Sequence, residues 1–353
     1  MNRKSPAWSA RARTGREEVG AARCTRSAAP HTVIKGMTFG WGARRGDYRS
    51  PASRDSLIAL RETGAEWIAL SFWTWQDTIW STRIHFDYGY TVTDGDIQHV
   101  VGLARDLGLK VCLKPVVNSR DGLWRGLIRF PDESDPKTDY WRDWFRSYGD
   151  FINHYAELGQ TLDVDMFCVG CEMVQTEHRE TEWLQVIEDI RQRYSGPLVY
   201  NANHGSEDQV SWFSALDLIG TSAYYPVAQE PEASWQAMAA PWETVKQRLE
   251  QLHRRFRKPV IFMEIGCRSA RGAALMPWDF AHREWPISQA EQAAFYHSAL
   301  EAFWGLPWFE GFFWWDWRTH LYPREAAAKD TGFDIYGKLA ESVLSEYYHR
   351  TVD

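Results

Sequence analysis

Strand-like and helix-like segments alternate along almost the whole chain, and this alternation constrains the fold more than any other feature. Short apolar runs that end in polar or aromatic residues predict strands at residues 32–40, 66–73, 109–117, 166–170, 198–203, 216–224, 259–264 and 309–315. Amphipathic stretches predict helices at residues 53–63, 94–107, 139–158, 181–194, 241–256, 288–303 and 337–347. Ser53 is the expected N-cap of the first helix. Eight strands, each followed by a helix or a helix-sized gap, are typical of a (β/α)₈ TIM barrel.

A doubly wound open sheet is the alternative fold. Such a sheet usually carries a GxGxxG turn after its first strand, whereas here that strand ends in Phe39-Gly40-Trp41-Gly42. No linker or repeat interrupts residues 31–353, so we expect a single barrel domain there. Residues 1–30 differ, because they hold seven Lys and Arg against two Glu. We expect a disordered basic leader. It lacks the apolar stretch of a signal peptide, which indicates a cytoplasmic location and leaves secretion open.

Charge and composition narrow the class of partner. The chain carries 40 Lys plus Arg against 47 Asp plus Glu, a formal net charge of -7, and the part after the leader is more acidic still. This balance argues against nucleic acid or an anionic membrane and favours a neutral substrate. No run approaches the roughly 18 apolar residues of a membrane helix. The oligomeric state is left open.

Metal-binding patterns are weak. The five cysteines are scattered, and Cys168 and Cys171 form a lone CxxC with no second ligand pair, which favours two small strand residues over a zinc site. His85, His178 and His204 have no metal-like spacing. We expect neither a metal nor an organic cofactor.

The active site of such a barrel lies at the carboxyl ends of the strands, so the candidate residues can be read there. The strand ends offer Trp73, Trp75, Lys114, Asn118, Glu172, Asn201, Asn203, Tyr224, Tyr225, Glu264 and Trp314 to Trp317. Two carboxylates on different strands suit the cleavage of glycosidic bonds, in which one carboxyl gives a proton and the other stays ionised. Amides, lysine and tyrosine can bind sugar hydroxyls.

Tryptophan is unusually abundant, with 20 residues in 353. Flat indoles suit the apolar face of a pyranose, so we expect sugar platforms in addition to an aromatic core. Residues inside helices and strands, such as Trp183, are expected to pack. The group at strand ends and in loops is expected on the face that carries both glutamates: Trp41, Trp73, Trp75, Trp124, Trp278, Trp315 and Trp317. Of Trp314 and Trp315, one should face the barrel mouth, because strand side chains alternate.

Several segments resemble glycoside hydrolase family 113. MEIGCRS (263–269) is similar to the family's nucleophile motif, and FCVGCEM (167–173) to its acid/base motif. KGMTFG, LKP, the Asn-x-Asn of the fifth strand, IGTSAYYP and FFWWDW are similar too, and the resemblance spans residues 32 to 345 in order.

The resemblance implies a retaining β-mannanase on a (β/α)₈ barrel, with Glu172 as acid/base and Glu264 as nucleophile. A retaining mechanism requires carboxyl groups about 5–5.5 Å apart. Most of the related barrel glycosidases place Asn before the acid/base. Cys171 stands there, so the contact to the sugar 2-hydroxyl must come from elsewhere, with Asn203 and Asn118 as candidates, and the sugar is less firmly implied.

Neighbouring side chains complete the predicted site. Tyr224 or Tyr225 should hold the Glu264 carboxylate, and Arg268 should either orient Glu264 or pair with a loop acid. Three alternatives stay open. They are another β-linked glycan such as xylan or glucan, a carbohydrate-binding barrel without catalysis, and an enzyme that uses Lys114 as a Schiff base.

Overall fold

The computed structural model describes residues 33–132 and 138–350, which all belong to one compact unit, Thr32–Asp353. The basic leader predicted at residues 1–30 lies outside the described residues.

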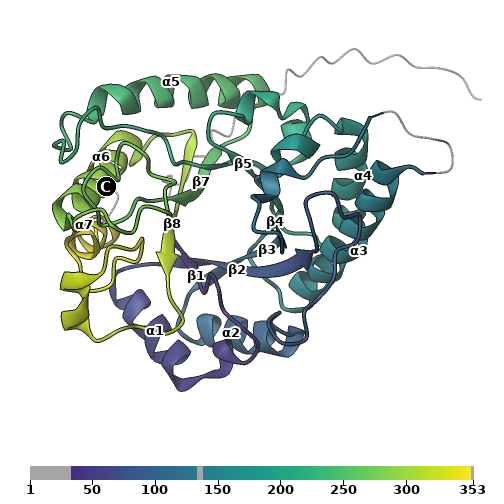
Figure 1. The fold of residues 1–353 in the computed structure, drawn as a ribbon, viewed down its shortest axis with the longest axis horizontal. Coiled ribbons are helices and arrows are strands. Elements are labelled where there is room, and N and C mark those ends of the chain that lie inside the picture. The colour runs from purple at the N-terminus through teal and green to yellow at the C-terminus, as the bar shows by residue number, and fades with distance from the viewer. Residues whose placement is uncertain (1–32, 133–137, 351–353) are drawn as a thin grey trace, which may run out of the picture. The chain divides into compact units, whose positions relative to one another are not determined.

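The strands pair in chain order and close into a barrel, with β8 paired to β1 and every described pair parallel (Figure 1). They are β1 (Ile34–Phe39), β2 (Trp67–Gln76), β3 (Lys110–Ser119), β4 (Met166–Cys171), β5 (Leu198–Asn203), β6 (Leu218–Ser222), β7 (Val260–Ile265) and β8 (Phe309–Trp317). The predicted (β/α)₈ barrel is confirmed, and the alternative of an open sheet is excluded.

Helices surround the barrel. They are α1 (Pro51–Glu62), α2 (Asp94–Asp106), α3 (Tyr140–Thr161), α4 (Glu180–Arg191), α5 (Ala239–Phe256), α6 (Gln289–Phe303) and α7 (Leu339–Tyr348). In Figure 1, α1 and α2 lie below the barrel, α3 and α4 to its right, α5 above, and α6 and α7 to its left. The β5–β6 connection instead carries two short 3₁₀ turns, Glu207–Gln209 and Ser211–Ala215.

Two element ends differ from the sequence prediction. The N-cap of α1 is Ser50, whose side chain accepts from the Ser53 backbone N–H at 3.1 Å, so the assignment of Ser53 as N-cap was wrong. Pro51 takes the first helical position, where its missing N–H costs nothing. Strand β6 ends at Ser222 because the chain turns there, and the Tyr224 N–H donates to the Ser222 carbonyl at 2.9 Å. Tyr224 therefore stands beyond the strand.

The core has two parts. The larger packs the helices on the outer face of the barrel, and a smaller cluster lies among side chains of the strands: Ile34, Ala69, Cys112, Met166, Cys168, Val199, Leu218, Ile261, Met263 and Phe313. Gly36 makes room for Phe313, because a Cβ there would overlap its ring. Cys168 and Cys171 are both buried free thiols, as the packing interpretation of the CxxC predicts.

None of the helices within the described residues is long and apolar enough to span a membrane.

Candidate active site

The two candidate carboxylates both stand at the carboxyl ends of strands and are nearly buried. Glu264 belongs to β7, and Glu172 follows β4 directly; their exposed fractions are 5% and 7%. A buried carboxylate needs cations or hydrogen-bond donors to remain charged, so the partners of each decide its chemistry.

Irregular strand pairing sets the orientation of both glutamate side chains. Strict alternation would place Met263 and Glu264 on opposite faces of β7, yet Met263 lies in the strand cluster and Glu264 contacts Lys114 of β3. The register of β7 shifts on both sides near this point, which turns Glu264 toward the barrel mouth. Strand β4 shifts likewise between Cys168 and Cys171, and Glu172 then adopts a left-handed φ of 53°.

Glu264 is held by donors from three other strands or strand ends. The Lys114 ammonium, fully buried on β3, forms an ion pair with Oε1. The Tyr224 hydroxyl donates to Oε2 at 3.0 Å, and the Asn201 amide donates to Oε1 at 3.2 Å. Burial alone would lower the pKa of Lys114, but the ion pair with Glu264 raises it above its usual range. Lys114 is therefore a charged partner of Glu264 and not the neutral amine that Schiff-base chemistry requires.

Glu172 is held mainly by one loop. Between β3 and α3, the Arg125 guanidinium and the Trp124 indole N–H both donate to Oε2, at 2.9 and 3.1 Å. Burial raises the pKa of Glu172, but Arg125, Ser222 and Trp124 together outweigh burial and hold the pKa below its usual range. In the free protein Glu172 is thus a carboxylate.

Asn201 is a site residue that the sequence analysis did not favour as a sugar contact. It was noted at the end of the fifth strand, but Asn203 and Asn118 were preferred as sugar contacts. Its amide lies 3.2 Å from both the Cys171 sulfur and Glu264 Oε1, while its carbonyl accepts from Ser222 at 3.2 Å. The Cys171 thiol in turn lies 3.5 Å from Glu264 Oε1. The position before Glu172 thus contacts the other carboxylate.

A buried tyrosine and a third glutamate support the segment that carries Glu172. The Tyr200 hydroxyl accepts from the Met173 backbone N–H at 2.9 Å and donates to Glu177 Oε1 at 2.7 Å. Burial raises the pKa of Glu177 to about 8. No sequence pattern predicts this hydrogen-bonded chain, because Tyr200 lies on the outer face of β5.

Four of the predicted sugar platforms form one cluster. The Trp41 ring packs edge-on against Trp73 and Trp315, each with centroids 4.7 Å apart, and Trp73 packs against Trp75 at 5.4 Å. All four are partly exposed, and the indole nitrogens of Trp73 and Trp75 have no partner among the described residues. Lys114 lies 5.8 Å from the Trp315 ring centre. Because Lys114 also pairs with Glu264, the tryptophan cluster lies close to this carboxylate.

The remaining tryptophans separate by face. Trp314 is fully buried and stacks on Tyr296 with centroids 3.8 Å apart, so Trp315 is the one that faces outward at the mouth, as predicted. Trp317 is also fully buried, and its N–H donates to Ser56 of α1 at 3.0 Å. Its placement with the sugar platforms was wrong, because it lies on the outer face of β8.

His204 and Trp278 form a second aromatic surface. Trp278 is exposed and stacks on His204 with ring centroids 5.2 Å apart. Burial lowers the pKa of His204, and the nearby Glu172 and Glu207 only partly oppose this effect. His204 is therefore a neutral ring near Glu172.

Other predicted site residues have different partners. Tyr225 donates to the buried Glu207 and not to Glu264, so of the two tyrosines Tyr224 is the one that holds the carboxylate. Arg268 is buried and binds Asp279 at 3.3 Å and the His282 carbonyl at 2.7 Å, which is the loop-acid alternative. The Asn203 amide donates to the His204 carbonyl at 3.1 Å. Asn118 lies beside Trp75 in the β2–β3 register.

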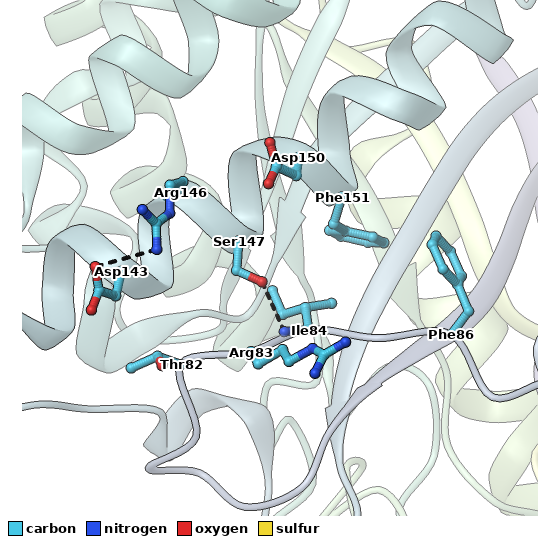
Figure 2. A pocket seen from close by; sticks show the side chains of 9 residues that line it. All are labelled: Thr82, Arg83, Ile84, Phe86, Asp143, Arg146, Ser147, Asp150 and Phe151. Atoms are coloured by element: carbon cyan, nitrogen blue, oxygen red, sulfur yellow. Dashed lines mark hydrogen bonds and ion pairs between the residues drawn. The ribbon is translucent and has the colours of Figure 1, made fainter.

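A separate cavity of about 440 Å³ lies between α3 and residues 82–86 (Figure 2). Its lining includes Phe86, Phe151, Arg83 and Arg146, and neither candidate glutamate belongs to it. Within residues 33–132 and 138–350, no group of three or more His, Cys, Asp or Glu is arranged to hold a metal ion.

A parallel eight-stranded barrel with two buried carboxylates at the ends of β4 and β7, edged by tryptophans, defines a barrel glycoside hydrolase. Comparison with protein families agrees, because residues 37–338 match the model of Glycoside Hydrolase Family 113. The chain belongs to this family.

Solved structures show the same relationship. A β-1,4-mannanase of family 113, solved as a complex, is 36% identical with a TM-score of 0.84, over 90% of this chain and 99% of that one. A family 113 β-mannanase from Alicyclobacillus acidocaldarius is 40% identical with a TM-score of 0.83, over 90% and 97% of the two chains. A β-glucuronidase from Faecalibacterium prausnitzii, at 14% identity and a TM-score of 0.59 over 90% of this chain and 48% of that one, shares the fold alone. No curated protein matched the chain.

Proposed function

We propose that this glycoside hydrolase is a retaining endo-β-mannanase in which Glu264 is the nucleophile and Glu172 the acid/base. The observation that carries the proposal is the difference between the two carboxylates. Glu264 is bound by a buried ammonium, a tyrosine and an amide, whereas Glu172 is bound by donors from one loop. Two carboxylates in unlike surroundings suit the two different roles that double displacement requires.

In the first step, Glu264 attacks the anomeric carbon and forms a C–O bond as the glycosidic C–O bond breaks. Glu172 gives its proton to the leaving oxygen. Lys114 and Tyr224 bind Glu264 and fix its position, so little reorganisation is needed before attack. We expect the two carboxyl groups to lie about 5–5.5 Å apart with substrate bound, as retention requires.

In the second step, Glu172 removes a proton from water, whose oxygen attacks the same carbon and releases Glu264. This step needs Glu172 as a carboxylate, the form that Arg125 and Trp124 favour in the free protein. The first step needs the protonated form. Glu172 therefore takes up a proton from solvent before the first step, and the second step returns a proton to it.

A neutral glycan fits the charges at the mouth. Lys114 and Arg125 are both paired with the candidate glutamates, so neither buried cation is left to bind an anionic substrate. The tryptophan cluster offers partly exposed indole faces for sugar contacts. Mannan is the proposed polymer, because the family 113 structures at 36% and 40% identity are described as β-mannanases.

Reducing-sugar release from konjac-type glucomannan tests the proposal, with mannan, xylan and mixed-linkage glucan as parallel substrates. We expect release from mannan and glucomannan, the β-anomer as the first product by proton NMR, and almost no release by Glu172→Gln. Faster hydrolysis of xylan or glucan would move the proposal to another β-glycan. An α-anomeric first product would contradict the retaining mechanism.

A further inference from the structure

One short loop supplies both donors to Glu172. Trp124 and Arg125 are adjacent in sequence, and both bind the same atom, Oε2, at 3.1 and 2.9 Å. The other carboxylate oxygen, Oε1, is thus the one through which a proton can pass to or from a substrate. Two donors on one oxygen fix the plane of a carboxylate as well as its position.

Arg125 is built into the site and is not a mobile surface residue. Only 8% of it is exposed, and its guanidinium lies 5.6 Å from the centre of the Trp41 ring. Its Nε has no partner among the described residues. A buried cation is costly unless it is paired, so Arg125 depends on Glu172 as much as Glu172 depends on Arg125.

The backbone of the loop is shaped for this contact. The Trp124 indole lies against Gly126, where a Cβ would overlap the ring. Gly122, at the start of the loop, has a left-handed φ of 79°. The loop therefore presents a flat indole and a guanidinium together, and glycine at both points permits it.

We propose that Arg125 is a positioning residue for the acid/base Glu172: it orients this carboxyl group and stabilises its charged form, and so limits the pH range of the reaction. The inference rests on the proposed function, since it gives Arg125 its role through Glu172. Trp124 assists as the second donor to the same oxygen.

The charged and titratable groups around Glu172 identify Arg125 as the deciding one. Lys114 faces it from β3, His204 from beyond β5, Tyr224 from beyond β6, and Glu177 and Cys171 from its own segment. Lys114 is committed to Glu264, and His204, Tyr224 and Cys171 are neutral. Arg125 is the largest of the effects that oppose burial, so its removal should raise the pKa of Glu172.

The pH profile of kcat/KM tests this role, because the alkaline limb reports loss of the proton from the acid in the free enzyme. We expect Arg125→Met to shift this limb upward by about one pH unit or more, since an opposite charge at this range lowers a carboxyl pKa by that amount. Arg125→Lys should retain part of the effect. Trp124→Phe, which keeps Arg125, should shift the limb in the same direction by less.

Arg129→Met is the matched control. Arg129 is exposed on the same loop, so its profile should coincide with that of the unmodified enzyme. Coincidence of the Arg125→Met profile with the same curve would overturn the proposal. If Arg125→Met does not fold, as thermal melting would show, the Arg125→Lys and Trp124→Phe profiles decide in the same way.

A second readout separates this inference from the proposed function. NMR titration of carboxyl-labelled glutamate, with the Glu172 signal assigned by its loss in Glu172→Gln, measures the pKa without any substrate. An upward shift in Arg125→Met supports the inference even if no mannan is hydrolysed, which would refute the proposed function alone. An unchanged Glu172 pKa overturns the inference even in an active mannanase.

Discussion

The two glutamates at the barrel mouth have the same side chain, similar burial and one cation each, yet they are held by different kinds of structure. Glu264 is bound by Lys114 from β3, Asn201 from β5 and Tyr224 just beyond β6. Glu172 is bound by Trp124 and Arg125, both in the β3–α3 connection. One carboxylate is fixed by the barrel itself and the other by a loop.

This difference matches the work proposed for each. A nucleophile keeps one charge state before attack, so rigid donors on several strands suit it. An acid/base must gain and lose a proton in each cycle, so its donors have to yield.

Glu264→Ala should cause the largest loss of activity among these variants. Removing the proposed nucleophile leaves no covalent route, so we expect turnover to fall by about 10⁴-fold or more on every substrate. Initial rates on glucomannan and on a dinitrophenyl β-mannobioside measure this. Glu230→Ala, at an exposed site, is the control. Near-normal activity of Glu264→Ala on either substrate would remove Glu264 from the mechanism.

Glu172→Ala should give a loss that depends on the leaving group. General acid catalysis is worth about 10²–10⁴-fold, and a dinitrophenolate leaves without a proton. We therefore expect a large drop on glucomannan and a far smaller drop in kcat/KM on the aryl glycoside. Azide should rescue the second step and give a β-mannosyl azide. Equal losses on both substrates would show that Glu172 is not the acid.

Lys114→Met should reveal how much the barrel depends on the Glu264 pair. Lys114 is fully buried against Glu264, so removing the cation leaves an unpaired buried carboxylate at a cost of about 3–5 kcal/mol in the free energy of unfolding. Urea unfolding measures this. The double variant Lys114→Met/Glu264→Gln should recover much of the loss. If the double variant is as unstable as the single one, packing of the lysine stem and not charge explains the cost.

The barrel and the two carboxylates could be predicted from the sequence more completely than the residues around them. Apolar runs followed by glutamate placed Glu172 and Glu264 at strand ends, because strand length and chain order are encoded locally. The shifts of register that turn both residues inward depend on how neighbouring strands pair, and no local sequence pattern predicts them. The same limit misplaced Trp317, since a bulge or bend decides which face a strand-end residue takes.

Contacts between residues that are far apart in the sequence also could not be predicted. Arg125 and Trp124 lie 47 and 48 residues before Glu172, and only the fold brings them to one carboxylate oxygen. Asn201 was visible at a strand end, but its contact with both Cys171 and Glu264 depends on the geometry of three strands. By contrast, the sequence predicted that either Tyr224 or Tyr225 binds Glu264. The turn after Ser222 places Tyr224 in that position.

Tyr224→Phe should give the smallest effect and the sharpest test of the strand-held site. The Tyr224 hydroxyl donates to Glu264 Oε2 at 3.0 Å, and a hydrogen bond to a charged group is worth about 1.5–3 kcal/mol. If that bond orients the nucleophile, kcat should fall by about 10–100-fold. Tyr225→Phe is the matched control, because its hydroxyl binds Glu207, which Arg248 and Thr221 also hold. We expect it to lower the melting temperature while kcat changes little. A larger loss of kcat in Tyr225→Phe than in Tyr224→Phe would mean that the structure assigns the nucleophile's partner to the wrong tyrosine.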